Sequence, residues 1–178
     1  MDRGLLLDQL ATYCTSFPEE AAYVVRFEDL LREAPCFERT HLPGHLTGSL
    51  WIVNPERTET LLVHHVKLNK WVQPGGHADG DENVVRVALR EGEEETGLLH
   101  LHTDGQIFDL DIHPIPARAD FPAHLHFDVR FLAVASPSEK IVVSEESHDV
   151  RWIPLASLAN WTTERSVLRM KDKIVGHG

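Results

Sequence analysis

One stretch of the chain, Gly76–Leu98, concentrates acidic side chains at spacings that could bind a cation. It holds seven carboxylates and two arginines, a local net charge of −5 (two minus seven): Asp79, Asp81, Glu82, Arg86, Arg90, Glu91, Glu93, Glu94 and Glu95. On a helix, Glu91 and Glu95 fall on one line and Glu94 lies beside them. Carboxylates so close repel one another unless a cation neutralises them, and Mg²⁺ or Mn²⁺ prefers such oxygen ligands. The alternative is a solvated acidic helix face.

A helix over this stretch also needs a surface to pack against. Apolar or small residues lie on the arc next to the acidic line: Val84, Val85, Ala88, Leu89 and Gly92. A glycine in mid-helix costs roughly 1 kcal/mol relative to alanine, so Gly92 predicts close contact between the helix and a sheet. Gly97 is expected to end the helix, because glycine adopts the left-handed conformation common at helix C-termini.

The order of glycines and charges in this stretch resembles the Nudix box. The matching residues, at the intervals of that motif, are Gly76, Glu82, Arg90-Glu91, Glu94-Glu95 and Gly97-Leu98. The preceding run from Trp71 to Gly76 also resembles the family pattern. One position departs, since the residue after Arg90-Glu91 is usually aliphatic in the family and is Gly92 here.

The resemblance implies roles for these residues. Glu91, Glu94 and Glu95 would bind Mg²⁺ or Mn²⁺, with the carbonyl of Gly75 as a further ligand. Arg90 is expected to hold the carboxylates in register. The remaining box positions expected to be structural are Gly76, Glu82 and Gly97.

The implied fold class is α/β, a Nudix-type α/β/α sandwich around a mixed sheet. Residues 41–178 are expected to form this Nudix hydrolase domain, and residues 1–40 an N-terminal helical extension packed on the same domain. The β-rich runs that predict strands are Gly48–Val53, Thr60–Val66, Ile107–Ile115 and His124–Ala135.

Two helices are expected in the N-terminal extension. Leu5–Thr15 is amphipathic, and Ser16-x-x-Glu19 is a capping-box pattern that predicts the start of a second helix, with Pro18 in its first turn. These helices could form a lid, a dimer surface or plain packing, so a homodimer remains open.

Histidines supply a second set of candidate site residues. His77 follows Gly75-Gly76 and could bind metal or touch phosphate, although a loop histidine is more often a solvated turn residue. In the strand His124–Ala135, one face is polar: His124, His126, Asp128 and Arg130. We expect His126 and Arg130 to contact substrate or an accessory metal, with His113 as a neighbour; the alternative is a face that is simply wet.

The general base is open between two glutamates. In some Nudix members an acidic residue in the loop before the closing strand serves as the base, and the matching loop here offers Glu146, with Glu145 next to it. Glu91 in the box is the rival. A bound cation would depress the pKa of Glu91, which favours Glu146 as the proton acceptor.

Composition excludes several classes of function. The 178-residue chain has a net charge of −11, which argues against binding nucleic acid through a basic surface. No apolar run approaches the length of a membrane span. Two cysteines without a CxxC spacing predict free thiols, and we expect a cytoplasmic protein.

The function that the resemblance implies is Mg²⁺-dependent hydrolysis of a nucleoside diphosphate linked to another moiety, of the nucleotide sugar or ADP-ribose type. Hydrolysis of nucleoside triphosphates to release pyrophosphate is the first alternative. A diphosphate isomerase of this fold is disfavoured, because its cysteine position is occupied by Gly75. A non-catalytic sensor is disfavoured by the intact box glutamates, and we expect no DNA-binding segment beside the core.

Overall fold

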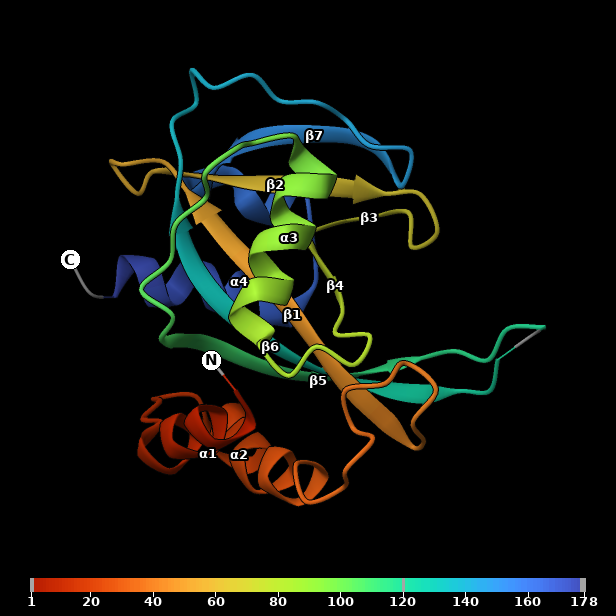
Figure 1. Cartoon of the computed structure of the whole chain (residues 1–178). Helices are drawn as coiled ribbons and strands as arrows, with labels where there is room; N and C mark the ends of the chain where they lie inside the picture. Colours follow the sequence, from red (N-terminus) through yellow and green to blue (C-terminus); the bar gives the residue numbers. More distant parts are fainter. Residues whose placement is uncertain (1, 120, 177–178) are drawn as a thin grey trace.

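The computed structural model describes residues 2–119 and 121–176, which form a mixed sheet between helices (Figure 1). The strands are β1 Gly44–Val53, β2 Glu59–His65, β3 Lys70–Val72, β4 Gly75–His77, β5 Ile107–Ile115, β6 His124–Val134 and β7 Ser147–Pro154. The helices are α1 Arg3–Thr12, α2 Pro18–Leu30, α3 Val84–Thr96, the 3₁₀ helix η1 Leu155–Asn160, and α4 Arg165–Val175. The predicted α/β class is confirmed.

Strand β1 is the centre of the sheet. The strand order is β3-β2-β1-β6-β5, with β4 also paired to β1 and β7 to β2. β1 and β6 run parallel along their whole shared length, from Gly44 beside Leu125 to Val53 beside Val134. The other pairings are antiparallel. The sheet is therefore mixed, as expected, and β1 pairs directly with β2, β4 and β6.

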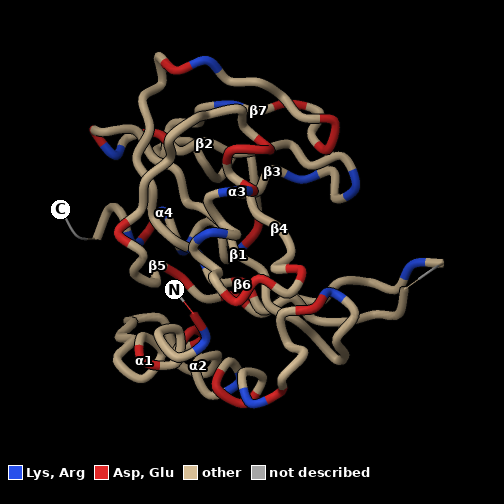
Figure 2. The backbone as a smooth tube through the Cα atoms, in the orientation of Figure 1, with Lys and Arg blue, Asp and Glu red and all other residues tan. Residues whose placement is uncertain are grey.

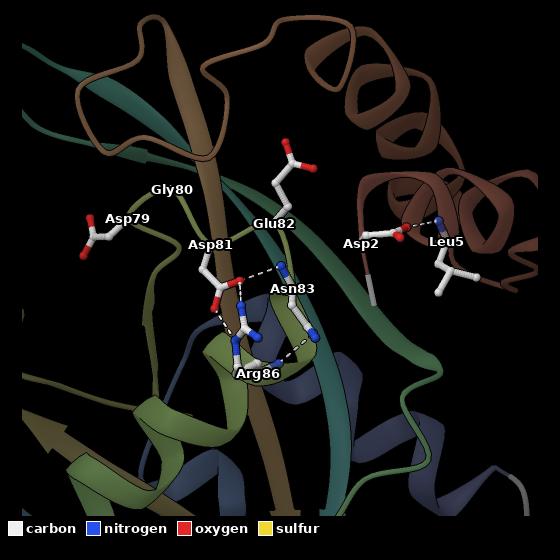
Figure 3. A pocket seen from close by; sticks show the side chains of 8 residues that line it. All are labelled: Asp2, Leu5, Asp79, Gly80, Asp81, Glu82, Asn83 and Arg86. Atoms are coloured by element: carbon white, nitrogen blue, oxygen red, sulfur yellow. Dashed lines mark hydrogen bonds and ion pairs between the residues drawn. The ribbon is translucent and has the colours of Figure 1, made fainter.

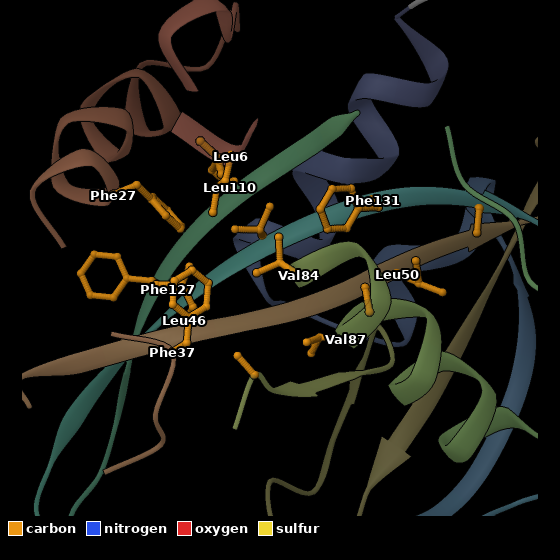
Figure 4. Close-up of a cluster of buried hydrophobic side chains, with 14 of the residues drawn as sticks. Leu6, Phe27, Phe37, Leu46, Leu50, Val84, Val87, Leu110, Phe127 and Phe131 are labelled. Carbon is orange, nitrogen blue, oxygen red and sulfur yellow. The ribbon is translucent and has the colours of Figure 1, made fainter. Parts of the chain in front are cut away.

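The alternation of β1 divides the core between the two faces of the sheet. Leu46 and Leu50 pack in the cluster that contains α3, whereas Trp51 and Val53 pack in the cluster that contains α4. Figure 1 accordingly shows α3 and α4 on opposite sides of the sheet. The N-terminal helices α1 and α2 add side chains such as Phe27 to the α3-side core (Figure 4).

Two glycines let α3 approach the sheet closely. A Cβ on Gly92 would lie 2.6 Å from Cδ1 of Leu50, so the predicted close contact at Gly92 is confirmed. On the sheet side, a Cβ on Gly48 would lie 2.7 Å from the carbonyl oxygen of Val84 and 3.1 Å from the backbone nitrogen of Ala88. The helix backbone therefore rests almost directly on the backbone of β1.

We expect Gly48→Ala to destabilise the fold by roughly 1–3 kcal/mol, because the added methyl group meets backbone atoms that cannot rotate away. The measurement is the free energy of unfolding from urea titrations followed by circular dichroism. Gly4→Ala in α1 is the matched control, since its nearest contact would be an ordinary 3.4 Å to Asp2. Equal stability of the two variants would contradict the close approach of α3.

Both ends of the box helix are capped, and its C-terminal end is the predicted one. Asn83 caps α3, its side-chain oxygen accepting a hydrogen bond from the backbone N–H of Arg86 at 3.0 Å. Gly97 ends α3 in the left-handed conformation, with φ of 70° and its N–H donated to the carbonyl of Glu93. The helix therefore presents its acidic C-terminal half at a fixed position over the sheet.

The second N-terminal helix starts differently from the prediction. Its N-cap is Phe17, which provides no side-chain cap, and Pro18 is the first helical residue. The predicted capping box at Ser16 is therefore wrong. Thr15 explains the difference: its hydroxyl donates to Glu20 and accepts from the backbone N–H of Phe17, which fixes the chain one residue later. Among the described residues, no helix has the length and apolar composition to cross a membrane.

Candidate active site

The C-terminal half of α3 brings Glu91, Glu94 and Glu95 together beside the short strand β4. Glu95 is 6% exposed, and its Oε2 accepts a hydrogen bond from the N–H of Gly75 at 3.0 Å. Burial, with the neighbouring Glu91, Glu146 and Glu94, raises the pKa of Glu95 to about 8. Burial also raises the pKa of Glu91. Ionising Glu91 and Glu95 is therefore costly without a counter-cation.

The glycines of β4 make room for these carboxylates. A Cβ on Gly76 would lie 2.4 Å from the carboxyl carbon of Glu91, and a Cβ on Gly75 would lie 2.0 Å from Oγ of Ser49. Both glycines pair with β1, Gly76 beside Gly48 and Gly75 beside Ser49. The backbone of β4 is thus held between the central strand and the acidic face of α3, a position that only glycine fills without displacing a neighbour.

Arg90 ties the helix to the strand. Its Nη2 donates to the carbonyl of His77 at 3.0 Å and to Oε1 of Glu91 at 2.8 Å. This geometry agrees with a role in holding Glu91 in register. The box residue Glu82 lies at the other end of α3, where it forms an ion pair with Arg3 at 2.8 Å. Glu82 therefore joins the N-terminal helix to the box loop.

The turn before β7 delivers a fourth carboxylate. One ligating atom each of Glu146, Glu95 and His65 lie within 4.8 Å of one another. The carbonyl of Glu146 accepts from the N–H of Val66 at 2.9 Å, which fixes the turn to the end of β2. Figure 2 shows acidic residues on the C-terminal half of α3 and on this turn. Glu146, predicted from a loop about fifty residues from the box, therefore lies beside the box carboxylates.

The donor set fits a hard divalent cation. Four carboxylates converge, and one of them, Glu95, is buried with a raised pKa. Oxygen donors of this charge are the ligands that Mg²⁺ and Mn²⁺ prefer. The residues that would hold the ion are Glu91, Glu94 and Glu95, with the predicted carbonyl of Gly75, and Glu146 lies beside them.

Comparison with known families agrees with this geometry. A family model described as the NUDIX domain matches residues 45–171. The chain belongs to the Nudix family. The match includes the whole box and the loop that carries Glu146, and it begins after the two N-terminal helices. With the box glutamates intact, the protein is a Nudix pyrophosphohydrolase.

Several solved structures share the fold. A C. elegans Ap4A hydrolase binary complex is 18% identical, covering 74% of this chain and 96% of that chain, with a TM-score of 0.60. The E. coli dihydroneopterin triphosphate pyrophosphohydrolase is 15% identical, with coverages of 75% and 96% and a TM-score of 0.58. The NUDIX domain of Shewanella oneidensis NrtR, complexed with ADP ribose, is 20% identical, with coverages of 74% and 86% and a TM-score of 0.52. At these identities the likeness shows the fold.

The predicted substrate residues His77 and His126 meet in this Nudix hydrolase. Their ring centroids are 4.9 Å apart, and both rings also contact His45. His45 could not be predicted from the sequence, because only the parallel pairing of β1 with β6 places it beside His126. His65, which lies beside Glu95, was also not expected at the site.

Arg130 departs from the prediction of a substrate contact. Its side chain is 2% exposed, and its guanidinium donates to three aspartates, Asp109, Asp111 and Asp128, at 2.7–3.1 Å. Helix α4 closes this region, because Arg169 also donates to Asp109, at 2.8 Å. Around Arg130 the polar face of β6 is therefore a buried ion network.

A pocket at the N-terminal end of α3 contains none of the converging carboxylates Glu91, Glu94, Glu95 and Glu146. It lies between the turn Asp79–Asn83 and the start of the chain at Asp2 and Leu5 (Figure 3). At 1.5 Å per residue, Glu94 is about 16 Å further along the helix than Asn83. Charged side chains that line this pocket already have partners; Arg86, for example, pairs with Asp81 at 2.6 Å.

Proposed function

We propose that this Nudix hydrolase uses Mg²⁺ to cleave the diphosphate of a nucleoside diphosphate linked to another moiety. The observation that carries the proposal is the convergence of four carboxylates, three from α3 and one from the turn before β7, around β4. A diphosphate is itself anionic, so it can approach such a cluster only when a cation neutralises the charge. A bound cation would explain both the acidity of the cluster and the crowding of its carboxylates.

Each carboxylate has a proposed role. Glu91, Glu94 and Glu95 hold the cation, and Glu146 accepts the proton of the attacking water. When bound, Mg²⁺ supplies charge neutralisation at the diphosphate oxygens. Arg90 keeps Glu91 in position through its second bond to the carbonyl of His77.

The position of Glu146 favours it as the base. It is exposed in a turn, whereas Glu91 is bonded to Arg90 and packs over Gly76. A carboxylate that ligates a cation is a good anchor and a poor proton acceptor, because the cation lowers its pKa. Loops also commonly carry catalytic groups that complete a site when substrate binds.

We expect Glu146→Gln to lower kcat by about 10²-fold, a typical share for a general base, without changing the Mg²⁺ concentration needed for half-maximal rate. Glu91→Gln should instead raise that concentration and lower turnover at limiting metal. Mg²⁺ titrations of both variants, with rates at saturating metal, make the comparison. Glu145→Gln, one residue away in the same turn, is the matched control.

A kcat near that of the wild type in the Glu146 variant would assign the base to Glu91 or Glu145. Recovery of the Glu91 variant at high Mg²⁺ would support its role as an anchor.

The substrate class can be tested with a panel of diphosphate and triphosphate compounds. Cleavage of a nucleotide sugar, ADP-ribose or a dinucleoside polyphosphate exposes terminal phosphates that alkaline phosphatase converts to inorganic phosphate. Cleavage of a nucleoside triphosphate releases pyrophosphate, which inorganic pyrophosphatase converts. The Ap4A and ADP-ribose compounds named for the similar structures belong in the panel. We expect the first group to be preferred; turnover confined to triphosphates would favour the alternative.

We also propose the cytoplasm as the location, because Cys14 and Cys36 are both free thiols in the described chain. Cys36 is buried, and burial raises the pKa of its thiol to about 11, so it is unreactive.

A small-molecule nucleotide derivative is the expected partner, and a homodimer through the N-terminal helices remains a prediction.

A further inference from the structure

Strand pairing gathers five histidines at one end of the sheet. His45 of β1 lies beside His126 of β6, and His126 lies beside His113 of β5. His77 of β4 and His124 of β6 complete this histidine cluster. The ring centroids of His45, His77 and His126 are 4.9–5.2 Å apart, and His124 is 4.9 Å from His45. Three of the rings, those of His45, His77 and His126, each offer a nitrogen within 4.8 Å of the others.

One ring nitrogen of His45 faces a carbonyl oxygen, and the other is buried without a partner among the described residues. It is 1% exposed, and its Nδ1 lies 3.3 Å from the carbonyl oxygen of His41, which can only accept a hydrogen bond. The proton is therefore on Nδ1, and Nε2 carries a lone pair. Nε2 is buried and has no hydrogen-bond partner among the described residues. An unpaired buried acceptor is costly, so this atom points to an absent ligand.

Two further rings are oriented in the same way. Nδ1 of His124 lies 2.9 Å from the carbonyl of Pro122, and Nδ1 of His113 lies 3.0 Å from Oδ2 of Asp111. Metal-binding histidines characteristically donate one ring N–H to a carbonyl or carboxylate, which fixes the other nitrogen as a ligand. Packing alone does not require that three neighbouring rings share this arrangement.

Burial lowers the pKa of His45 and His126, which favours the neutral imidazole with a free lone pair. Arg39 and Asp79 are the charged side chains that face His77. Burial and the neighbouring histidines lower the pKa of His126 to about 2. Arg39 is itself paired with Asp79, which also faces His77. Neutral imidazoles at neutral pH are the form that binds a metal ion.

We propose that His45, His77 and His126 bind one divalent cation of the zinc class through their ring nitrogens, at a site distinct from the carboxylates. Imidazole suits Zn²⁺, Co²⁺ and Ni²⁺, whereas Mg²⁺ prefers oxygen. Zn–N bonds of about 2.0–2.1 Å in a tetrahedral site place the ligating nitrogens roughly 3.4 Å apart. Nε2 of His124 is already 3.3 Å from Nε2 of His126, so His124 is positioned for a fourth ligand.

Such an ion would join the ends of β1, β4 and β6. The backbone of His77 is also the acceptor for Arg90, which holds Glu91. The zinc-class site would therefore fix β4 next to the carboxylates without sharing a ligand with them. The inference does not depend on the proposed reaction, because the histidines would bind the ion in the absence of substrate.

The test is zinc binding by the untagged, full-length protein in excess Mg²⁺, which occupies the carboxylates. After dialysis against Zn²⁺, bound metal per chain is measured by mass spectrometry of the elements. We expect one Zn²⁺ per wild-type chain and its loss in His45→Gln and in His77→Gln. The control His102→Ala removes an exposed histidine outside the cluster and should keep the metal. The triple variant Glu91→Gln/Glu94→Gln/Glu95→Gln should keep it too.

Co²⁺ gives a second measurement. Nitrogen ligation in a tetrahedral site produces intense visible absorption, which should appear in the wild type and the triple glutamate variant and be absent from His77→Gln. Circular dichroism verifies the fold of each variant; if His45→Gln does not fold, His77→Gln decides. Zinc that is retained in the histidine variants, or lost only in the glutamate variant, would overturn the proposal.

Discussion

Glu94→Gln and Glu95→Gln are each expected to lower turnover by about 10²-fold or more while the fold stays intact. An amide has nearly the shape of the carboxylate but lacks the charge that a divalent cation requires. Glu94 is exposed, so its replacement disturbs no packing. Glu95 is buried, but a glutamine oxygen can still accept the hydrogen bond from Gly75.

The measurement is the rate of substrate hydrolysis at limiting and at saturating Mg²⁺, with circular dichroism to verify folding. Glu93→Gln is the matched control, because Glu93 shares the helix and the charge but lies off the line of Glu91 and Glu95. Its activity should match the wild type. Undiminished activity of either Glu94→Gln or Glu95→Gln at limiting Mg²⁺ would refute the assignment of these residues.

Arg130→Met should destabilise the protein by roughly 3–5 kcal/mol, because three buried aspartates would lose the cation that they share, and Arg169 reaches only two of them. The alkyl part of the side chain is retained, so lost packing contributes little. The measurement is the free energy of unfolding in urea. Arg32→Met, which removes an exposed arginine paired with Asp29, is the control and should change stability by less than about 1 kcal/mol.

The pH dependence of this loss has a definite sign. Burial raises the pKa of Asp109, but pairing with Arg169 and Arg130 lowers it by more and holds it below its ordinary value. The resulting stability is present above the ordinary aspartate pKa and is lost as the pH falls through the lower folded value. Without Arg130 that pKa should rise, so the deficit of the variant should be larger at pH 7 than near pH 4. A variant with normal stability and a raised KM would contradict this and would indicate that Arg130 contacts substrate.

Structural features that depend on residues close together in the sequence could be predicted well. The box helix, its left-handed end at Gly97 and the close approach at Gly92 follow from helical periodicity and from glycine's lack of a side chain. The alternation of β6 correctly separated its apolar face from its polar face. These features depend on contacts within one element, which the order of residues reveals directly.

Contacts between distant elements could not be predicted. The polar face of β6 gives no sign that α4 covers Arg130, because Arg169 and the aspartates of β5 are separated from it by long intervals in the chain. His45 was missed for the same reason, since only the parallel pairing of β1 with β6 places it beside His126. Burial and partnership are properties of the tertiary structure, so the same polar residue can be a ligand or an ion pair.

Hydrolysis is proposed to depend on a divalent cation that Glu91, Glu94 and Glu95 bind. The most direct test titrates Mn²⁺ into the wild type and the Glu94→Gln/Glu95→Gln double variant, with free Mn²⁺ measured by electron paramagnetic resonance. The same samples are assayed for Mn²⁺-supported hydrolysis of the best substrate from the panel. We expect the double variant to lose the tight Mn²⁺ binding and the turnover together. Tight binding and turnover that both persist in the double variant would contradict it.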